Sequence, residues 1–468
     1  MISRFTDSEI LYALEWLIRL AMLLVVPFRR SPAATRTWLL LIFFLPIPGL
    51  LLFLLIGSPR FPAWRMERFQ HTRAFLRDLR GRLQARGAVP GEVPEVSELA
   101  ERLGDLPAVG GNGLELIEDY DAGIARLIAD IDGAKHHVRI LSYIFADDVV
   151  GCQVIDALGR AVRRGVACHV LIDGVGSHHW IRGTLRALQQ RGVEARAALP
   201  FRPFRHWTRR DMRNHRKLFI VDGAIGYAGS QNIVARDFRP GIVNRELVAR
   251  VSGPAVAEMT AVFLTDWYLE TEQLLEPELA IPAASGECRM QVLPSGADYP
   301  LEGFQTLLTW QIGRARREVV LVTPYFIPDD SLVAALTTAV VRGVEVRVIV
   351  SKVVDQRLVN LAQSSYYEEL LRCGVHIHRY RDFLLHAKTV RIDDSLGIIG
   401  SSNVDIRSFQ LNEEVSLLLL DRPSIDRLRT IHDSYLAGSD ELTLDEWCKR
   451  GPLRKLAEIG AQLVSPLL

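Results

Sequence analysis

The 468-residue sequence is short of cysteine, lysine and net charge, and each shortage excludes a class of protein. Its five cysteines are scattered and show no C-x-x-C spacing, which argues against a disulfide scaffold and against a zinc ribbon. A formal net charge of +1 excludes a chain that is basic throughout, the signature of many polyanion-binding proteins. With 49% hydrophobic and 24% charged residues, the chain is not mostly disordered. Only six of its 56 basic residues are lysines, so the position of each lysine is informative.

Charge is also absent from a long N-terminal run. Residues 37–57 carry no charged side chain over 21 positions, about the length that crosses a bilayer as a helix. Residues 10–28 are nearly as apolar, and Glu15 and Arg19 stand one helical turn apart, where they can pair. We interpret residues 1–58 as a transmembrane hairpin, with an in-plane helix as the alternative for the first segment.

Arginines set the expected orientation of this hairpin. Its loop carries three arginines and its flanks carry six, so the positive-inside rule places both termini and the main body in the cytoplasm. Residues 60–86 hold eight arginines and two acids, with aromatic and aliphatic residues between them. This stretch, within a basic linker over 59–110, is either a solvated helix or a helix lying on an anionic bilayer surface.

The remaining chain is a duplication. AVRRGVACHVLID (161–173) aligns with AVVRGVEVRVIVS (339–351), and LSYIFADD (141–148) aligns with TPYFIPDD (323–330). Each copy alternates apolar strands with helices, which predicts an α/β fold. The paired acids Asp147–Asp148 and Asp329–Asp330 are interpreted as helix N-caps in preference to metal ligands. The predicted units are a first lobe over 111–285, a second lobe over 286–440 and a C-terminal tail over 441–468.

The most specific pattern, H-x-K-x4-D-x6-G-S-x-N, occurs twice, 171 residues apart and in register with the duplication. A single H-x-K would be noise, but two copies with every spacing kept are not a chance event. Two of the six lysines fall here. The residues that match the pattern are His215, Lys217, Asp222, Ser230 and Asn232 in the first copy, and His386, Lys388, Asp393, Ser401 and Asn403 in the second.

These residue types suit phosphodiester chemistry. On a strand, positions i and i+2 point to the same side, so each His projects with its Lys. A phosphodiester needs a nucleophile, an acid for the leaving alcohol, and positive or donor groups around the phosphate oxygens. Two facing copies supply all of these, so we expect neither a metal nor another cofactor. A glutamate follows in each copy in an N-x-E context, and Glu246 and Glu414 either orient an imidazole or form surface ion pairs.

The duplicated pattern resembles the phospholipase D superfamily, and with the apolar N-terminal region it is similar to bacterial cardiolipin synthases of that type. Further similar stretches are LPIPGLLLFLLIG, FADDVVG, TPYFIPDD and SSNVDIRSFQLNEE. The resemblance covers nearly the whole chain. It implies an α/β fold with duplicated phospholipase D-like sandwich lobes and one active site between them, added to the predicted transmembrane hairpin.

The resemblance also implies roles for the repeated residues. One histidine attacks phosphorus and forms a phosphohistidine, and the other protonates the leaving group; family order makes His215 the nucleophile and His386 the acid. The remaining members fall into two groups. Those implied to hold the phosphate and substrate are Lys217, Lys388, Ser230, Asn232, Ser401 and Asn403, and those implied to support the catalytic group are Asp222 and Asp393.

The segment LPFRPFRHWTRRDMRNHR (199–216) has six arginines, three aromatic residues and one acid, and its counterpart in the second copy is shorter. It is interpreted as a loop that dips into an anionic lipid interface, with a packed loop and a surface for single-stranded nucleic acid as alternatives.

The resemblance further implies a reaction and a place. The expected reaction moves a phosphatidyl group between two phosphatidylglycerol molecules to give cardiolipin and glycerol. A phospholipase D-type hydrolase is the alternative, and a membrane-tethered nuclease is a weaker one. The expected location is the bacterial inner membrane, as a multi-pass protein with its catalytic body in the cytoplasm. The expected partners are phosphatidylglycerol, other phospholipids and the anionic membrane surface, and no nucleic acid is expected.

Overall fold

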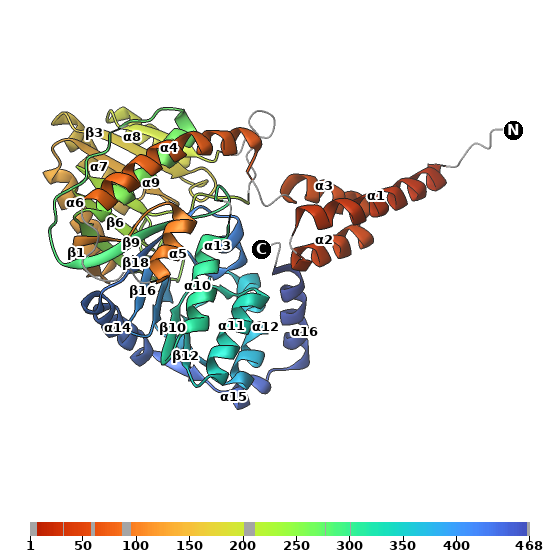
Figure 1. Cartoon of the computed structure of the whole chain (residues 1–468). Helices are drawn as coiled ribbons and strands as arrows, with labels where there is room; N and C mark the ends of the chain where they lie inside the picture. Colours follow the sequence, from red (N-terminus) through yellow and green to blue (C-terminus); the bar gives the residue numbers. More distant parts are fainter. Residues whose placement is uncertain are drawn as a thin grey trace.

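The computed structural model of the chain consists of two similar α/β lobes and a projecting group of N-terminal helices (Figure 1). The residues that it describes are 7–30, 32–57, 61–86, 95–200, 211–276, 278–299 and 301–465.

The N-terminal region is not the predicted hairpin. It consists of α1 (Asp7–Arg29), α2 (Pro32–Phe44) and α3 (Pro46–Ile56). The run taken as one span is broken at Leu45, because Pro46 cannot donate the next helical hydrogen bond. The two halves then pack closely: a Cβ on Gly49 would stand 2.9 Å from Cα of Ile42. At 1.5 Å per residue each half is about 20 Å or less, too short for a bilayer core.

Among the described residues, one helix, α1, is long and apolar enough to cross a membrane. Its 23 residues extend about 35 Å. Large apolar side chains such as Leu17, Leu24 and Phe28 are exposed on it, which a buried core helix would not show. The predicted pair within this helix is confirmed, with Arg19 Nη2 donating to Glu15 Oε2 at 3.3 Å. The helix therefore suits a membrane anchor, and a multi-pass protein is not supported.

The two lobes share one 15-stranded sheet, and apart from an additional antiparallel edge strand in the second lobe, β19, the strand order is the same from each end. In each lobe three parallel strands are followed by antiparallel ones, and the lobes join where β1 pairs with β9. The strands of the first lobe, from its edge to the junction, are β4 (Glu194–Ala198), β3 (Ala167–Asp173), β2 (His137–Ser142), β5 (Leu218–Val221), β6 (Ile225–Gly229), β8 (Val248–Ser252) and β1 (Val109–Ile117). Those of the second lobe are β19 (Ser439–Leu442), β13 (His376–Tyr380), β12 (Glu345–Ser351), β10 (Glu318–Val322), β15 (Thr389–Ile392), β16 (Leu396–Gly400), β18 (Glu414–Leu419) and β9 (Cys288–Ser295).

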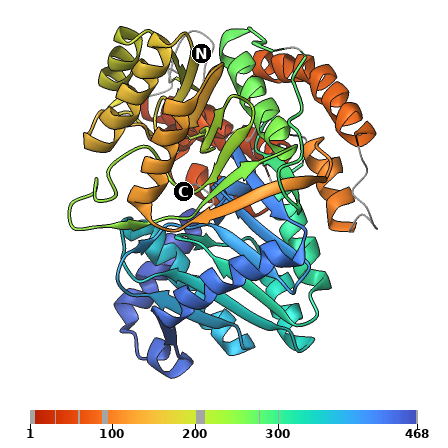
Figure 2. The same ribbon diagram turned by 90° about the vertical axis from the view of Figure 1, so that its left-hand side faces the viewer.

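Helices cover the sheet, and the two lobes lie one above the other in Figure 2. One apolar core contains residues of both lobes. The outer core of each lobe is separate. The helix α5 (Glu95–Gly104) packs on β9 and joins the core of the second lobe. The helices of the first lobe are α6 (Tyr120–Gly133), α7 (Val149–Arg163), α8 (Ile181–Gln190) and α9 (Ala255–Thr271). Those of the second lobe are α10 (Gly303–Arg314), α11 (Asp330–Val341), α12 (Arg357–Cys373), α13 (Ile406–Gln410), α14 (Arg422–Ala437), α15 (Leu444–Cys448) and α16 (Pro452–Val464).

The arginine-rich helix α4 (Ala63–Ala85) fits neither reading of the basic stretch. It packs on α9, and its apolar side, including Phe75 and Leu79, joins the shared core. Arg65 is itself buried, with Nε 3.2 Å from Asp298 and Nη1 2.7 Å from Glu270. The helix is therefore part of the folded body. The sequence suggested that Arg65 lies in solvent or on lipid, but carboxylates distant in sequence neutralise it inside the protein.

Two smaller sequence predictions are confirmed. Asp148 and Asp329 cap the N-termini of α7 and α11, each accepting hydrogen bonds from two backbone N–H groups. All five cysteines are free, and two of them, Cys168 and Cys288, are buried.

Candidate active site

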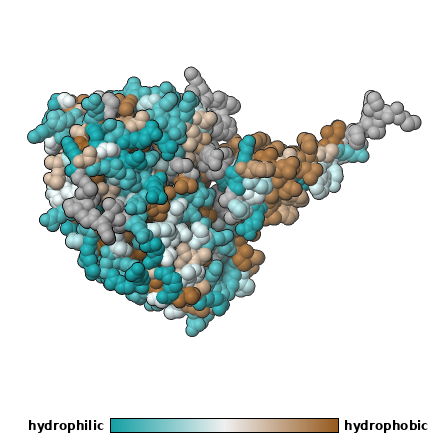
Figure 3. All heavy atoms as spheres, in the orientation of Figure 1, coloured by the Kyte–Doolittle hydropathy of each residue, from teal (hydrophilic) through white to brown (hydrophobic). Residues whose placement is uncertain are grey.

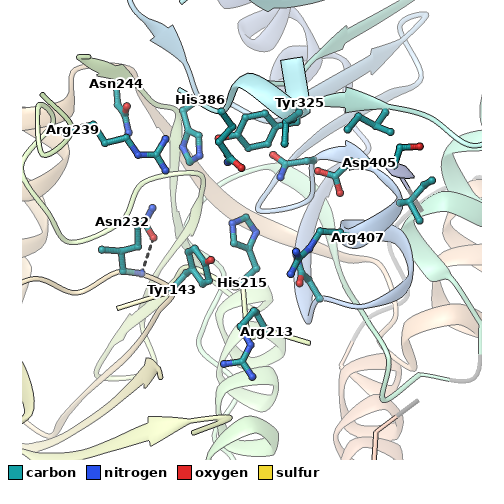
Figure 4. Close-up of a pocket in the computed structure, with 18 of the residues that line it drawn as sticks. Tyr143, Arg213, His215, Asn232, Arg239, Asn244, Tyr325, His386, Asp405 and Arg407 are labelled. Atoms are coloured by element: carbon teal, nitrogen blue, oxygen red, sulfur yellow. Dashed lines mark hydrogen bonds between the residues drawn. The ribbon is translucent and has the colours of Figure 1, made fainter. Parts of the chain in front are cut away.

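A cavity of about 200 Å³ lies between the lobes and contains both motif histidines (Figure 4). It is smaller than the roughly 300–1,000 Å³ pockets that enclose drug-sized ligands, so it suits a headgroup and its phosphate rather than a whole lipid. Equivalent residues of the two lobes face each other across it. These pairs are Tyr143 and Tyr325, His215 and His386, Asn232 and Asn403, and Asn244 and Asn412.

Each histidine is carried by a segment that pairs with the other lobe. β14 (Leu384–Leu385) runs parallel to β7 (Asn244–Arg245), and the His386 N–H donates to the carbonyl of Arg245 at 2.8 Å. The same arrangement is repeated in the other direction, where the His215 N–H donates to the carbonyl of Glu413 at 2.9 Å. The backbone thus brings the H-x-K segment of one lobe beside the N-x-E segment of its partner lobe.

The consequence is that each His–Glu pair is formed across the lobes. His215 Nδ1 lies 3.0 Å from both carboxylate oxygens of Glu414, and His386 Nδ1 lies 2.8 and 2.9 Å from those of Glu246. Both glutamates are buried. Of the two roles that the sequence left open, the structure gives these glutamates the one that orients an imidazole. Each carboxylate accepts a hydrogen bond from Nδ1–H, so the proton of the neutral imidazole stays on Nδ1 and Nε2 is free for chemistry.

The motif serines contact these glutamates rather than the cavity, which corrects their assignment to the substrate. Ser401 Oγ donates to Glu414. Ser230 Oγ donates to the carbonyl of Leu247 at 3.3 Å and lies close enough to Glu246 to help lower the pKa of its carboxyl. Each hydroxyl also accepts from a backbone N–H at the neighbouring strand of the sheet, from Val415 and Leu247 at 3.0 and 3.1 Å. The serines therefore help to hold the carboxylates of Glu414 and Glu246 in place, and these carboxylates in turn hold the imidazoles of His215 and His386.

The motif lysines lie one layer deeper than the histidines. Lys217 Nζ donates to the carbonyl of His215 at 2.7 Å, and Lys388 Nζ does the same to His386. Both lysines are buried, and Lys217 also stands over the Tyr143 ring at 5.1 Å. Two cations close to one cavity repel each other, so an anion in the cavity would be stabilised by both.

The motif asparagines line the cavity as expected. Asn232 Oδ1 accepts from the backbone N–H of Ile144 at 3.1 Å, which leaves its amide N–H groups for the cavity (Figure 4). Asn403 is its counterpart on the opposite wall. Neutral donors of this kind suit the oxygens of a phosphate.

Burial shifts the pKa values of the charged and titratable side chains around the cavity. It lowers the pKa of His215 and of His386 to about 4, an effect that the facing glutamates oppose. Burial lowers the pKa of Lys388 to about 8, and burial with the neighbouring Lys388 lowers that of Lys217. Burial alone would raise the pKa of Glu246 and Glu414, but the facing imidazole and lysine outweigh it and hold both below the usual range. At neutral pH the histidines are neutral and the glutamates ionised.

We expect anion binding to be coupled to proton uptake. A phosphate in the cavity raises the lowered pKa values of the histidines and Lys388, so binding is strongest at low pH and weakens as pH rises through the pKa values of the complex. One proton taken up changes affinity by up to about tenfold per pH unit. Calorimetric titration with inorganic phosphate at pH 6 to 8, in buffers of different ionisation enthalpy, measures the uptake. A binding constant that is independent of pH would contradict this electrostatic account.

The motif aspartates do not reach the cavity, which corrects their catalytic assignment. Asp222 accepts hydrogen bonds at 2.7 to 2.9 Å from the backbone N–H groups of Lys135, His136 and His137. Asp393 accepts three equivalent bonds from residues 316–318 at 2.8 to 3.0 Å. Each aspartate follows a core strand and ties its end to the start of the neighbouring strand in the sheet, β2 for Asp222 and β10 for Asp393, which is a structural role.

Replacing Asp222 with Asn is expected to reduce stability and to spare turnover. Asn tolerates the positive φ of +53° but offers one uncharged acceptor to three N–H groups. We expect a loss of about 1–3 kcal/mol of folding free energy, with turnover per folded molecule unchanged. Thermal unfolding and activity measured on the same preparation test this, and Asp393→Asn is the matched variant in the second lobe. A large loss of turnover without loss of stability would restore the catalytic assignment.

Sequence reasoning missed two further pairs of cavity residues. Tyr143 packs edge-on against His215, with ring centroids 4.7 Å apart, and its counterpart Tyr325 lies in the aligned TPYFIPDD stretch. Arg239 and Arg407 also line the cavity. Each arginine stands five residues before the N-x-E asparagine, so the pattern R-x4-N-x-E in both copies was the signal that could have identified them.

A buried ionic network supports the His215 segment. Arg216 is held between Asp266 and Glu413, with its Nη2 2.8 Å from the latter, and its Nε donates to the carbonyl of Glu414 at 2.9 Å. Burial and the nearby Asp298 raise the pKa of Glu413 to about 8. The Asp298 N–H donates to Glu413 Oε1 at 3.2 Å, and Asp298 also binds Arg65 of α4. Breaking this network would disturb the pair of His215 and Glu414, because Arg216 follows His215 in the chain and donates to the backbone of Glu414.

Two other sequence predictions concern this region. Of the segment 199–216, residues 201–210 lie outside the described residues, so its interfacial role stays a prediction. Arg213, in the described part, lines the cavity and donates to the carbonyl of Leu199 at 3.0 Å. Within the described ranges, no group of three or more His, Cys, Asp or Glu side chains is placed to hold a metal ion.

Comparison with known proteins agrees with this geometry. A family model described as "Cardiolipin synthase, PLD-like domain" matches residues 127–267 and 308–435. A cardiolipin synthase A from Serratia proteamaculans is 34% identical over 457 residues, covering 94% of each chain, and one from Proteus mirabilis is 33% identical over 95% of each. The crystal structure of a phosphatidylserine synthase from Haemophilus influenzae has the same fold, with a TM-score of 0.60 at 15% identity over 80% of this chain and 100% of the other.

Proposed function

We propose a two-step transfer for this chain, which belongs to the family of cardiolipin synthases with phospholipase D-like domains: it moves a phosphatidyl group from one phosphatidylglycerol to a terminal hydroxyl of another. The products are cardiolipin and glycerol. The observation that carries this proposal is the pair of crossed His–Glu contacts at a single cavity.

In the first step His215 Nε2 attacks the phosphorus of phosphatidylglycerol, and the bond from phosphorus to the glycerol oxygen breaks. His386, which takes up a proton as the anionic phosphate enters, gives that proton to the departing glycerol. Lys217, Lys388 and the cavity asparagines stabilise the charge on the phosphate oxygens. The first step leaves a phosphatidyl-His215 intermediate and a neutral His386.

In the second step the glycerol headgroup of another phosphatidylglycerol takes the place that glycerol has left. Neutral His386 removes the proton from its terminal hydroxyl, the oxygen attacks phosphorus, and the bond to His215 Nε2 breaks. His386 can act as the acid in the first step and as the base in the second, since the leaving and entering groups are both glycerol hydroxyls on the same side of the phosphorus. Each histidine ends in its starting state.

The helix α1 is proposed as a single membrane span at the bacterial cell membrane. Three arginines lie at or beyond its end on the side of the catalytic body, Arg29 as its last residue and then Arg30 and Arg36, so the positive-inside rule supports a body on the cytoplasmic side.

The test is product analysis with the full chain reconstituted in phosphatidylglycerol vesicles. Phosphatidylglycerol labelled in the headgroup and in the acyl chains should yield labelled glycerol and cardiolipin in equal amounts. Release of phosphatidic acid alone would replace the proposal with the hydrolase, in which water resolves the intermediate. Cleavage of single-stranded DNA without any lipid product would instead favour the nuclease.

A further inference from the structure

The C-terminal helix α16 packs on the second lobe with its apolar side facing outward. Helices on soluble domains bury their apolar side. In α16 the residues that face the protein are Glu458, Ala461 and, just beyond the helix, Ser465. The exposed stripe on the opposite side, with the exposed fraction of each residue, is Leu453 (82%), Leu456 (66%), Ile459 (54%) and Leu463 (55%).

This inversion is held in place by ion pairs. Glu458 is 2% exposed and lies 3.1 Å from the Nε atoms of both Arg450 and Arg454. Ala461 joins the small apolar cluster formed with Ile327 and Ala362. Arg450 also pairs with Glu368 of α12 at 3.4 Å, so this contact and the packing of Ala461 set the rotation of the helix on the lobe, and with it the direction of the apolar stripe.

The stripe lies on the side of the molecule that carries the anchor. In Figure 1 α16 runs along the side of the second lobe that faces α1–α3, and it lies crosswise to α1. Figure 3 shows hydrophobic residues on that side of the lobe, below those of the anchor helices. Arg36 of α2 lies 4.0 Å from Asp330, at the start of α11 on the same lobe. A bilayer crossed by α1 would therefore be within reach of α16.

The stripe also leads to the catalytic cavity. Its last member, Leu463, is two residues before Ser465, which lines the cavity. On this side the cavity wall is apolar and formed by Ile327, Val359 and Ile406. The basic residues Lys449, Arg450, Arg454 and Lys455, against one acid, Glu458, give the segment a positive charge that complements anionic lipid.

We propose that α16 lies in the plane of an anionic phospholipid surface with its apolar stripe among the acyl chains, and that it places the mouth of the cavity at the headgroup level. This inference rests on the proposed function for its lipid substrate. A lipid headgroup then enters the cavity from the end of α16, with its glycerol backbone against the apolar wall. The anchor holds the body near the bilayer, and α16 sets its orientation.

The test measures depth in the membrane, which requires no turnover. Spin labels are attached to Leu456→Cys and to Val341→Cys in the full chain, after the exposed or half-exposed Cys152, Cys373 and Cys448 are replaced with Ser. Val341 is a matched control because it is 85% exposed and stands at the end of α11 that lies farthest from the anchor, about 18 Å along that helix. Vesicles contain phosphatidylglycerol and a neutral lipid.

The label at 456 should be accessible to oxygen and shielded from a water-soluble nickel reagent, and the label at 341 should show the reverse. Equal accessibility of the two labels to the nickel reagent would overturn the proposal. A label at 456 shielded from both reagents would also overturn it, because the stripe would then be covered by protein. If no cardiolipin forms while the label at 456 is in lipid, the proposed reaction fails and the docking stands.

A kinetic experiment separates docking from chemistry. Replacing Leu453, Leu456 and Ile459 together with Ser should lower turnover on vesicles roughly tenfold while leaving turnover of monomeric short-chain phosphatidylglycerol unchanged. The control replaces Val341, which is 85% exposed and stands at the end of α11 away from the anchor, with Ser. Equal loss on both substrates would mean that the triple variant disturbs the site itself, and no loss on vesicles would mean that the stripe does not dock.

Discussion

Replacing either His215 or His386 with Ala is expected to reduce cardiolipin formation by at least about 10³-fold. The two imidazoles have different tasks in one cavity, so neither substitutes for the other. Both are held by a buried carboxylate at 3.0 Å or less. The measurement is the initial rate of cardiolipin formation by reconstituted variants whose thermal unfolding matches that of the unchanged protein.

The two variants should differ in what accumulates. With phosphatidylglycerol labelled in the phosphate, His386→Ala should retain a protein-bound label, because the intermediate forms slowly and lacks the base that resolves it. His215→Ala should retain none. The opposite pattern would exchange the two roles and keep the mechanism, whereas label on neither variant would contradict a covalent intermediate.

The matched control is a histidine–carboxylate pair on the surface. His376 Nδ1 lies 2.8 Å from Glu441 Oε1, and both side chains are exposed. His376→Ala should leave the rate unchanged, since an exposed pair far from the cavity contributes little. A rate loss for this variant comparable to those at the cavity would mean that the assay reports stability rather than chemistry.

Replacing Glu414 or Glu246 with Gln should produce the same defect as replacing the histidine of the other lobe that this glutamate contacts. Glu414→Gln is expected to reduce turnover by about 10²–10⁴-fold and to prevent formation of the intermediate, because an amide can impose the wrong tautomer on His215. Glu246→Gln is expected to cost a similar factor and to accumulate the intermediate, because it disables His386. The rates and the bound label are measured as for the histidine variants.

This crossed pattern is specific to the observed contacts. If each glutamate served the histidine of its own lobe, Glu246→Gln would prevent formation of the intermediate and Glu414→Gln would trap it. Glu441→Gln, on the surface, is the control and should match the unchanged protein. Equal and small effects for both cavity variants would reduce the glutamates to a packing role.

The sequence predicted the two lobes and the shared cavity because duplication makes chance improbable and because both copies keep every spacing. It did not predict that Glu414 belongs with His215, since that contact joins residues 199 positions apart and depends on how the lobes dock. It over-assigned Asp222 and Asp393, because a motif does not distinguish a residue that touches substrate from one that ties down a strand.

Errors at the N-terminus had a different cause. Hydropathy counts apolar residues but not breaks, so a run interrupted before Pro46 was taken as one span. Charge counts likewise placed Arg65 in solvent or on lipid, whereas its partners Glu270 and Asp298 follow more than 200 residues later. Both errors arise where tertiary contacts outweigh local composition.

The central claim, a covalent phosphohistidine between two displacements, is tested most directly by stereochemistry at phosphorus. Each in-line displacement inverts the configuration, so two successive displacements restore it. The substrate is phosphatidylglycerol made chiral at phosphorus with sulfur and an oxygen isotope, and the configuration of the cardiolipin formed is determined by phosphorus NMR. Retention of configuration is the predicted result, and inversion, which requires one direct displacement, would contradict the account.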